Sequence, residues 1–304
     1  TIIVSNLTSC VLANGSLDLS VLGGSTPYSY LWNNNDTTED LNNLSAGNYY
    51  VTIIDNNGCM WNDSATVNQP SNNLSLSLSS SNYNGFAISC FGGNNGEIYS
   101  NASGGTGSLI YMWSDMSSDT ALLNQTAGTY SLTVTDSVGC TLIDSIILTE
   151  PLELNSSYST TNVLCNGDST GSAIVIFSGG ITDYLLSWAG YTYPLLNGNN
   201  TFITPIGVPA GIYPYSATDM NGCTHSDTIT ITEPDIISSN AILSDYNGYN
   251  ISCNGTNDGS AILNLNGGTG ALTEDWLGYN PNSLYAGTYS YIITDNNNCI
   301  YTDS

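Results

Sequence analysis

Eight cysteines are the residues whose type and spacing most clearly indicate chemistry in this chain. Successive cysteines are separated by alternating long and short intervals of 49, 31, 50, 25, 58, 30 and 46 residues. An even number of cysteines at regular spacing is typical of disulfide bonds in a protein from an oxidising compartment. A bridge that closes a loop of about 50 residues stabilises a small domain by ~3–4 kcal/mol in the chain-entropy model. The cysteines are Cys10, Cys59, Cys90, Cys140, Cys165, Cys223, Cys253 and Cys299.

The residues around the cysteines recur in the same order four times. A Gly-Gly pair is followed after eight residues by Trp, then by an Ala-Gly-x-Tyr segment, an Asp six residues after the Tyr, and a Cys four residues after the Asp. Such coincidence indicates one fold repeated four times. The recurring aromatic residues, which we expect in the cores, are Trp32, Trp113, Trp188, Trp276, Tyr49, Tyr130, Tyr213 and Tyr289.

A Thr followed closely by a Pro marks each boundary between the predicted repeats, loosely from Thr66 to Pro70 and as Thr-Glu-Pro at residues 149–151 and 232–234. Proline ends the preceding strand and stiffens the connection, so we expect the repeats to lie end to end as a semi-rigid rod. The fourth repeat stops before its last strand is complete, and the chain resembles an excerpt from a longer array. The predicted repeats are residues 1–70, 71–151, 152–234 and 235–304.

Repeat symmetry leaves two sensible sets of disulfide pairs. We favour the set in which each repeat closes its own bridge, because it leaves no cysteine unpaired at either end. The other set joins the first cysteine of one repeat to the second cysteine of the next, and the sequence leaves it open. The favoured pairs are Cys10–Cys59, Cys90–Cys140, Cys165–Cys223 and Cys253–Cys299.

Metal sites are the competing interpretation of the cysteines and acidic loops. Zinc is not expected, because no Cys-x-x-Cys occurs and His225, two residues after Cys223, alternates with strand residues and is expected to be exposed. Calcium is a candidate at Asp55, Asp168 and Asp258, but no loop concentrates several carboxylates, and Asx turns explain these residues equally well. We therefore expect no metal and no cofactor.

The charge of the chain excludes several functions. It contains no Lys or Arg and 25 Asp plus Glu, for a formal net charge of -25. Without cations it cannot neutralise nucleic-acid phosphates or use a Walker lysine, an arginine finger or a Schiff base. No run approaches the ~18 apolar residues of a membrane span, and without Lys or Arg we expect no signal peptide within this stretch. Paired carboxylates could serve a glycosidase, but none stands out from the repeat background, so we expect no enzyme and no catalytic residue.

Alternation of apolar and polar residues predicts the fold. In the second repeat it predicts strands near residues 74–78, 98–102, 109–113, 130–136 and 142–148, and no helical period occurs. Six or seven short strands in about 75 to 88 residues indicate an all-β, immunoglobulin-like sandwich. The Trp is interpreted as core rather than as a sugar-stacking platform, and the Tyr after Ala-Gly as a corner tyrosine bonded to a loop backbone.

The combined motif resembles the SprB repeat, a family that builds giant surface proteins of Bacteroidetes. The third repeat carries it most fully, with Cys165-Asn-Gly-Asp-Ser-Thr-Gly-Ser-Ala173 and Asp219-Met-Asn-Gly-Cys223. The resemblance covers all four repeats and is weakest after Cys10 and at Asn298, which replaces Gly. It implies an extracellular, surface-attached or filamentous adhesin or gliding-motility protein exported by the type IX system.

Asp followed by Ser or Thr recurs four residues after each second cysteine and at further positions. These segments are similar to the Asp-Ser/Thr-apolar O-glycosylation motif of Bacteroidetes, and exposed strand positions suit a bulky, solubilising group. Ordinary strand alternation with Asp at a bulge is the alternative. The candidate acceptors are Ser64, Ser145, Thr228, Ser304, Thr37, Thr120, Ser137 and Ser169.

Two functions remain. Tandem repeats, disulfides and short Pro linkers favour a structural stalk or filament segment, whose partners are neighbouring repeats, other copies in a fibre and surface glycans. The alternative is a carbohydrate- or surface-binding adhesin module, expected above all in the irregular insertion from Tyr191 to Pro209 of the third repeat. The tyrosines that could form such a surface are Tyr28, Tyr30, Tyr191, Tyr193, Tyr246 and Tyr249.

Overall fold

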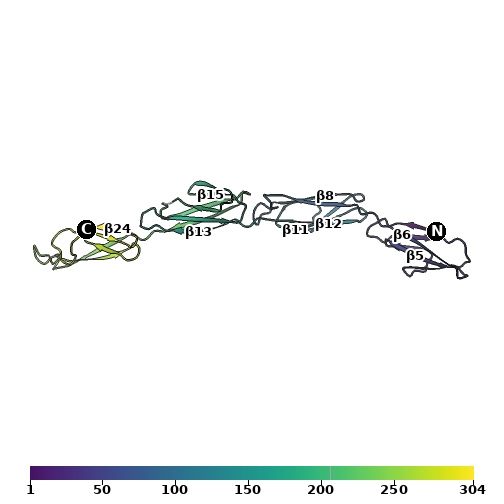
Figure 1. Ribbon diagram of the computed structural model, residues 1–304, viewed down its shortest axis with the longest axis horizontal. Helices are drawn as coiled ribbons and strands as arrows, with labels where there is room; N and C mark the ends of the chain where they lie inside the picture. Colours follow the sequence, from purple (N-terminus) through teal and green to yellow (C-terminus); the bar gives the residue numbers. More distant parts are fainter. Residues whose placement is uncertain (206) are drawn as a thin grey trace. The chain divides into compact units, whose positions relative to one another are not determined.

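The computed structural model describes residues 1–205 and 207–304 and contains only β-strands and irregular segments within them. The chain divides into two compact units, Thr1–Glu150 and Pro151–Ser304, which are described separately (Figure 1). All strand pairs are antiparallel, in small sheets of two to four strands. The expected all-β, immunoglobulin-like class is confirmed. The division into four repeats stays a prediction. The terms first, second, third and fourth repeat denote residues 1–70, 71–151, 152–234 and 235–304.

The first unit, whose residues are all described, contains four three-stranded sheets. In the first repeat, β1-β2-β4 and β3-β5-β6 face one another across a core, and in the second repeat β10-β8-β7 and β12-β11-β9 do so. The strands of the first repeat are β1 Ile2–Ser5, β2 Gly15–Leu19, β3 Ser29–Trp32, β4 Leu41–Leu44, β5 Gly47–Ile54 and β6 Met60–Val67. Those of the second are β7 Ser75–Ser80, β8 Gly96–Ser103, β9 Ile110–Trp113, β10 Ala121–Gln125, β11 Gly128–Thr135 and β12 Thr141–Leu148.

The second unit repeats this plan with two differences. The third repeat has a sheet β13-β14-β17 and a four-stranded sheet β16-β15-β18-β19, and the fourth has the sheets β20-β21 and β22-β23-β24. The strands of the third repeat are β13 Asn155–Thr161, β14 Ser172–Ser178, β15 Tyr184–Trp188, β16 Tyr191–Leu195, β17 Thr201–Ile203, β18 Gly211–Thr218 and β19 Thr224–Ile231. Those of the fourth are β20 Ser238–Leu243, β21 Ala261–Asn266, β22 Thr273–Asp275, β23 Tyr291–Thr294 and β24 Ile300–Asp303.

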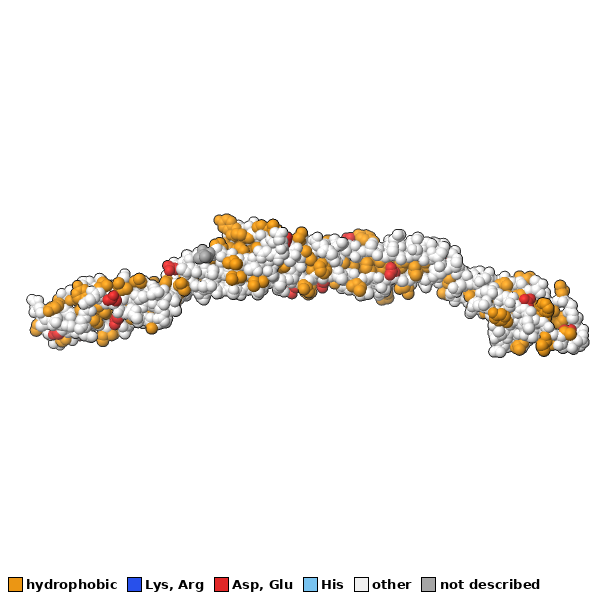
Figure 2. All heavy atoms as spheres, viewed as in Figure 1, with side chains coloured by type: hydrophobic (Ala, Val, Ile, Leu, Met, Phe, Trp, Pro, Cys, Tyr) orange, Lys and Arg blue, Asp and Glu red, His pale blue; other side chains and the backbone are white. Residues whose placement is uncertain are grey.

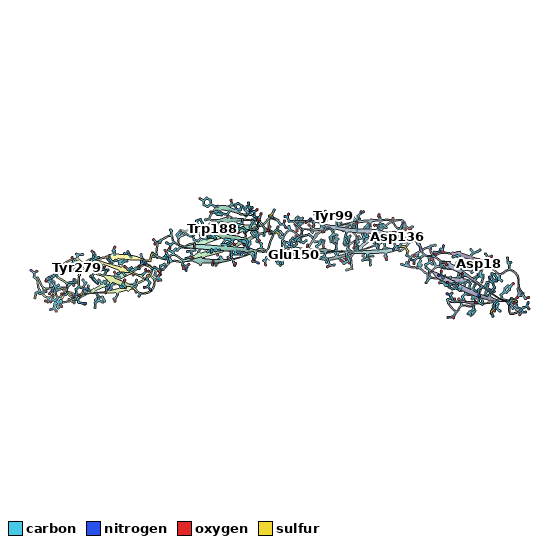
Figure 3. The ribbon with its side chains drawn as sticks, in the orientation of Figure 1. Asp18, Tyr99, Asp136, Glu150, Trp188 and Tyr279 are labelled. Carbon is cyan, nitrogen blue, oxygen red and sulfur yellow. A yellow bond between two sulfur atoms is a disulfide. The ribbon has the colours of Figure 1, made fainter. Side chains whose placement is uncertain are left out.

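Each repeat has its own hydrophobic core, built by the alternation seen in the sequence. On β14, Ala173, Val175 and Phe177 are buried while the residues between them face outward, as expected for a strand with one face on a core. The recurring tryptophans lie in these cores (Figure 3 shows Trp188). Their exposed fractions are 1% for Trp32, 2% for Trp113, 4% for Trp188 and 7% for Trp276.

The recurring tyrosines hold the turn just upstream of them in the sequence. In each repeat the hydroxyl donates a hydrogen bond to the backbone carbonyl four residues upstream, at 2.9 to 3.1 Å. This contact satisfies a turn carbonyl that no strand partner reaches. The pairs are Tyr49 with Ser45, Tyr130 with Thr126, Tyr213 with Pro209 and Tyr289 with Tyr285.

The surface reflects the absence of cations. Figure 2 shows mostly uncharged polar atoms and apolar side chains, with acidic side chains scattered between them. No helix of a length and hydropathy able to cross a membrane occurs among the described residues.

Candidate functional site

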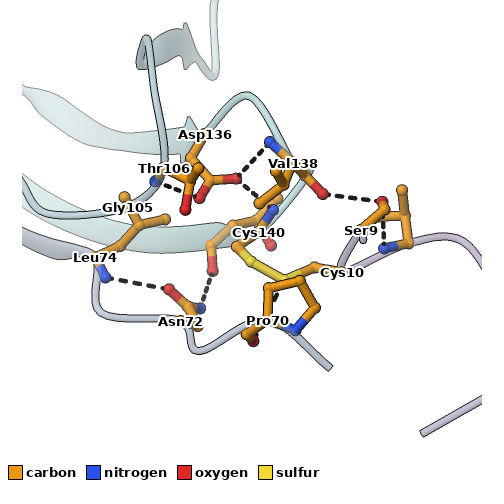
Figure 4. Close-up of a disulfide and its surroundings, with 12 residues drawn as sticks. Ser9, Cys10, Pro70, Asn72, Leu74, Gly105, Thr106, Asp136, Val138 and Cys140 are labelled. Carbon is orange, nitrogen blue, oxygen red and sulfur yellow. Dashed lines mark hydrogen bonds between the residues drawn. A yellow bond between two sulfur atoms is a disulfide. The ribbon is translucent and has the colours of Figure 1, made fainter. Parts of the chain in front are cut away.

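The second cysteine of each repeat lies in a tight turn that we call the cysteine hairpin. In the second repeat, Asp136 anchors this turn. One carboxylate oxygen accepts hydrogen bonds from the amides of Val138 at 3.1 Å and Cys140 at 2.8 Å, and the other accepts from the amide of Thr106 at 2.8 Å (Figure 4). Thr106 directly follows the Gly-Gly pair, so a single carboxylate ties the hairpin to that neighbouring turn. The four hairpins are residues 55–59, 136–140, 219–223 and 295–299.

The same anchor is present in all four repeats. The amide of the second cysteine donates to the Asp Oδ1 at 2.8 to 2.9 Å, and the amide after the Gly-Gly pair donates to Oδ2 at 2.8 to 3.1 Å. The second glycine of the pair packs directly against the carboxylate and has a positive φ, which only glycine adopts without strain. The anchoring residues are Asp55, Asp136, Asp219 and Asp295.

Asn298 keeps the hairpin geometry of the fourth repeat although it departs from the motif. Its φ is 63°, and the glycines at the equivalent positions, Gly58, Gly139 and Gly222, have φ of 82° to 83°. Asn is the side chain best suited after Gly to this left-handed conformation. The substitution is therefore compatible with the turn.

Backbone amides lower the pKa of the Asp55 and Asp136 carboxyl groups. The amides of Cys59 and Ser25 lower the pKa of Asp55 below its usual value. Burial acts to raise the pKa of Asp136, but the amides of Thr106, Cys140 and Val138 outweigh it and lower the pKa overall. Three or more amide donors stabilise the charged form in this way without any cation.

The first cysteine of the first repeat is bonded to the hairpin of the second repeat. A disulfide joins Cys10 to Cys140, with their Cα atoms 5.0 Å apart (Figure 4). The Cys10 amide and the Ser9 hydroxyl both donate to the carbonyl of Val138, each at 2.9 Å. Ser9 and Cys140 are only 8% and 2% exposed. The preceding repeat therefore covers this hairpin with backbone and side-chain contacts as well as the covalent bond.

The linker between these repeats strengthens the same contact. The Asn72 side-chain amide donates to the carbonyl of Thr141 at 3.1 Å, and the amide of Leu74 donates to the Asn72 side chain at 3.2 Å (Figure 4). Asn72 thus fixes the linker against the first residue of β12. Asp136 lies at the end of the second repeat where this contact forms (Figure 3).

The third and fourth repeats meet in the same way within the second unit. A disulfide joins Cys165 to Cys299, with Cα atoms 5.5 Å apart. The Asn297 side-chain amide donates to the carbonyl of Leu164 at 3.0 Å, and Cys299 is 8% exposed. A cavity of about 440 Å³ remains at this junction, lined from the third repeat by Cys165 and from the fourth by Cys299.

Two linker glutamates hold the loops that carry a first cysteine. The Glu150 carboxylate accepts from the amide of Gly92, and the Glu233 carboxylate accepts from the amide of Gly167, both at 2.6 Å. Each Glu belongs to a Thr-Glu-Pro segment, and each Gly lies two residues after the first cysteine. Sequence reasoning missed this role, although the recurrence of Glu before both prolines was a visible signal.

The favoured pairing of cysteines within a repeat is wrong. In the first repeat, Cys10 lies near the end of β6, where the Leu7 amide bonds to the Asn68 carbonyl, and Cys59 lies at the opposite end, in the turn before β6. The eight-residue ladder of β5 and β6 separates these ends by roughly 23 Å at 3.3 Å per residue. A disulfide needs Cα atoms within ~7 Å, so a repeat cannot close its own bridge.

The outcome for the eight predicted disulfide cysteines is therefore mixed. Cys90 and Cys223 are also disulfide-bonded. Cys59 and Cys253 are free and exposed, which corrects the prediction that all eight are bridged. These are the second cysteine of the first repeat and the first cysteine of the fourth. Cys10–Cys140 and Cys165–Cys299 each join the first cysteine of one repeat to the second cysteine of the next, which is the set that the sequence left open.

The candidate metal residues have other partners. His225 is half-buried on β19 rather than exposed, and its Nε2 lies 2.9 Å from the Ser156 hydroxyl. Asp258 accepts from the hydroxyls of Ser252 and Thr256, and Asp55 holds its hairpin. Asp168 is exposed, and its amide donates to the Cys165 carbonyl at 3.1 Å. Within the described residues, no three His, Cys, Asp or Glu side chains gather as metal ligands would.

The eight candidate glycosylation residues are all exposed. Ser64, Ser145 and Thr228 lie at equivalent places in β6, β12 and β19, and Ser304 follows β24. In these four, the backbone amide donates to the carboxylate of the preceding Asp at 2.7 to 2.8 Å. Thr37, Thr120, Ser137 and Ser169 lie in turns and loops.

The candidate tyrosines do not form one surface. Tyr191 and Tyr193 lie on β16, in the insertion that adds a strand to the third repeat, and Tyr193 packs on Phe202 with ring centroids 5.0 Å apart. Residue 206 of this insertion lies outside the described residues. Tyr28 and Tyr30 belong to the first repeat, and Tyr246 and Tyr249 belong to a short bridged turn of the fourth.

Comparison with known proteins gives one family match. The model of the SprB repeat family matches residues 1–37, 88–118 and 157–200. No curated protein sequence matches the chain. Among solved structures it is similar to the tetra-tandem repeat in the extending region of a large adhesion protein, at 12% identity over 98% of this chain and 95% of that chain, with a TM-score of 0.27.

Two further solved structures are similar to this chain. The protocadherin GammaB4 extracellular domain is 12% identical over 92% of this chain and 59% of that chain, with a TM-score of 0.30. Extracellular domains 3–5 of Drosophila OTK are 9% identical over 72% of this chain and 90% of that chain, with a TM-score of 0.26.

Proposed function

In this chain, which carries repeats of the SprB family, we propose a structural role as a stalk or filament segment of a large extracellular repeat adhesin, without catalysis. The observation that carries the proposal is the disulfide between consecutive repeats, Cys10–Cys140 and Cys165–Cys299. Disulfides persist in oxidising compartments, which supports placement outside the cell.

The disulfides give consecutive repeats two covalent connections instead of one. The polypeptide passes through the linker at Pro70, and the Cys10–Cys140 bond joins the same two repeats a second time. A force that stretches the chain is transmitted from Cys10 to Cys140 directly through the disulfide. The residues between these two cysteines therefore carry no tension. The folded repeats are then protected from unfolding under load, which suits a stalk.

Stretching single molecules tests this role. The two disulfides span 130 and 134 residues, and each released residue adds at most ~3.5 Å of contour length. We expect the reduced chain to extend by up to about 900 Å more than the oxidised chain before the polypeptide is fully taut. Equal extension of the two forms would contradict a load-bearing role.

The absence of Lys and Arg supports exposure outside the cell. The chain offers no basic residue to a trypsin-like protease and no lysine amine to a cross-linking reagent. The negative charge of -25, distributed over four repeats, keeps neighbouring chains apart. Attachment to the cell surface, export by the type IX system and a part in gliding motility belong to the same proposal, since SprB repeats are found in such proteins.

Glycosylation of the exposed Asp-Ser and Asp-Thr segments belongs to this proposal as well. The equivalent positions of Ser64, Ser145 and Thr228 on three strands support it, because a glycan there would project from the same place in each repeat. Peptide mass spectrometry of native material tests it. Unmodified masses for all three peptides would remove glycosylation from the proposal.

A binding module for carbohydrate is the second candidate. A cavity of about 390 Å³ in the fourth repeat is lined by Tyr249, Tyr285 and Tyr289, and the first two are 74% and 57% exposed. Exposed aromatic rings beside backbone polar groups suit a sugar face. A glycan-array screen of the full chain, repeated with Tyr249→Ala, distinguishes the candidates, because a pure stalk gives no saturable binding.

A further inference from the structure

The linker between the third and fourth repeats is bonded to the loop that carries Cys165. The Glu233 carboxylate accepts a hydrogen bond from the amide of Gly167 at 2.6 Å. The Asn166 side-chain amide donates to the carbonyl of Pro234 at 3.0 Å. Asn166 and Gly167 directly follow Cys165 in the sequence. The residues beside this cysteine are therefore held on the linker by two hydrogen bonds that do not involve its sulfur.

The other side of the same linker is bonded to the fourth repeat. The carbonyl of Asp235 accepts from the amide of Gly268 at 2.9 Å. The next amide, that of Thr269, donates to the Asp295 carboxylate at 2.8 Å. The same carboxylate accepts from the amide of Cys299 at 2.9 Å. A short series of hydrogen bonds thus connects the linker to the hairpin of Cys299.

These hydrogen bonds form a closed ring across the junction. The hairpin returns to the third repeat through the side-chain amide of Asn297, which donates to the carbonyl of Leu164 at 3.0 Å. Leu164 directly precedes Cys165, so the ring closes at the loop from which it starts. Each bond of the ring joins atoms other than the two sulfurs. The contacts that bring Cys165 and Cys299 together are therefore separate from the disulfide.

Glu233 provides the charged contact between the linker and the Cys165 loop. Its backbone is fixed on both sides, because the Thr232 carbonyl accepts from the amide of Val163 at 2.9 Å and Pro234 restricts the chain that follows. A hydrogen bond to an ionised carboxylate is stronger than one between neutral groups. The side chain of Glu233 is thus well placed to decide how firmly the loop is held.

The same contact recurs in the second repeat. The Glu150 carboxylate accepts from the amide of Gly92, also at 2.6 Å, and Gly92 lies two residues after Cys90. The contact therefore accompanies the Thr-Glu-Pro linker in two repeats. The linker after the first repeat has Gln69 at this position, and there Asn72 fixes the linker to the next repeat instead (Figure 4).

We propose that Glu233 is a positioning residue for the disulfide between Cys165 and Cys299. Its carboxylate holds the Cys165 loop on the linker, and the linker holds the Cys299 hairpin, so the two thiols are adjacent before they are oxidised. The contact thereby selects Cys299 as the partner of Cys165. This inference concerns how the junction forms, and it does not rest on the load-bearing role proposed above.

The disulfide forms by exchange with a small-molecule disulfide such as oxidised glutathione. The Cys165 thiolate attacks one glutathione sulfur, and a Cys165–glutathione bond forms while the other glutathione leaves as a thiol. The Cys299 thiolate then attacks the Cys165 sulfur, and the second glutathione leaves as a thiol. Two protein thiols are oxidised to one disulfide, and one oxidised glutathione is reduced to two thiols. Glu233 favours the second exchange, because it keeps the Cys165 sulfur beside Cys299.

Equilibration of the full chain in glutathione buffers of graded redox potential tests the proposal. Differential alkylation and peptide mass spectrometry then give the effective concentration of Cys299 at Cys165. Glu233→Ala should lower this effective concentration about tenfold, the loss expected for one hydrogen bond to a charged group. Glu233→Gln keeps an accepting oxygen and should lower it by no more than about threefold. The Cys10–Cys140 bond of the same molecules is the internal reference and should be unchanged.

Glu153→Ala is the matched control. Glu153 is an exposed linker residue like Glu233, but its carboxylate accepts from the Asn155 side chain at 3.3 Å. This variant should leave the effective concentration unchanged. The same value for Glu233→Ala and the unchanged chain would overturn the proposal. An equal loss in Glu153→Ala, or at Cys10–Cys140, would also overturn it, because the effect would then be a general loss of stability. The stretching experiment uses the unchanged chain, so its result is independent of this one.

Discussion

The hairpins around Cys140 and Cys59 share their internal bonds and differ in what covers them. Asp136 and Asp55 make the same three types of hydrogen bond, yet Cys140 is 2% exposed and Cys59 is an exposed residue. The difference comes from residues of the preceding repeat, since Ser9 and Cys10 contact Val138 and no residue contacts Asn57 in that way. The hairpin is thus a preformed surface of each repeat, and its burial is a property of the junction.

Removing the Cys10–Cys140 disulfide, which lies at the covered hairpin, should lower the stability of the chain more than any other change to the two hairpins. The double variant Cys10→Ala/Cys140→Ala opens a loop of 130 residues, which we expect to cost about 3–5 kcal/mol of stability. Cys59→Ala should change the stability by less than about 0.5 kcal/mol, as for other exposed substitutions. Equilibrium unfolding of the full chain in denaturant measures both. Similar losses of stability for the two variants would contradict the interpretation that the preceding repeat covers and stabilises the Cys140 hairpin.

Substitution of two equivalent glycines, Gly139 and Gly58, compares the covered and uncovered hairpins while every cysteine stays unchanged. Gly139 and Gly58 both have φ near 83°, so alanine at either position is strained by about 1–2 kcal/mol. A Cβ on Gly139 would also lie 3.0 Å from Val11 of the preceding repeat, whereas nothing lies within 4 Å of one on Gly58.

Gly139→Ala should therefore destabilise the chain by about 0.5 kcal/mol more than Gly58→Ala, because the Val11 side chain, which is 72% exposed, must shift to make room for the new methyl group. Thermal unfolding of the two variants measures this difference. The control is Gly139→Ala combined with Val11→Ala, which should recover most of the excess. If Gly139→Ala destabilises the chain no more than Gly58→Ala does, Val11 does not restrict the space beside the hairpin.

Acid should affect the two hairpins alike, and this is the smallest expected effect. Backbone amides lower the pKa values of Asp55 and Asp136 below the usual value of an aspartate carboxyl group. A carboxyl group with a depressed folded-state pKa stabilises the fold fully above its unfolded pKa, and this contribution is lost as the pH falls through the folded pKa.

Stability should accordingly be constant above about pH 5 and decrease below about pH 4. Asp55→Asn and Asp136→Asn should each flatten part of this decrease. Unfolding curves between pH 2 and pH 6, with Asp18→Asn as the control at an exposed strand position, measure the slopes. If only Asp136→Asn reduces the loss of stability at low pH, burial of the carboxyl group, rather than the backbone amides that both hairpins share, controls that loss.

Much of the fold was predictable because it depends on local periodicity. The predicted strand at residues 130–136 corresponds to β11 Gly128–Thr135, and that at 142–148 to β12 Thr141–Leu148. Both follow from apolar residues at every second position, which fixes the face that meets the core. The extra strand of the third repeat was not predicted, since β16 Tyr191–Leu195 contains Pro194, which is disfavoured inside a strand, and β16 lies at the edge of its sheet, held by its pairing with β15.

The roles of the hairpin residues were predictable only in part. Position-locked recurrence singled out Asp136 and the Gly-Gly pair, but it gave no reason for their recurrence. The reason is spatial, because the Asp136 carboxylate reaches the amide of Thr106, thirty residues earlier in the sequence. Ser9 and Asn72 were missed altogether, since neither belongs to the repeated motif; Ser9 bonds to the next repeat, and Asn72 bonds to Thr141, far from it in the sequence.

The sequence by itself determined the repeated β-sandwich, the aromatic cores and the absence of cation chemistry. These properties follow from residue type and from spacing within a few turns of chain. Only the tertiary structure decided which cysteines join. The length of the β5–β6 ladder places Cys10 and Cys59 at opposite ends of one repeat, so bonds form where the ends of two repeats meet. Sequence spacing measures distance along the chain, whereas a disulfide requires two sulfurs to be adjacent in space.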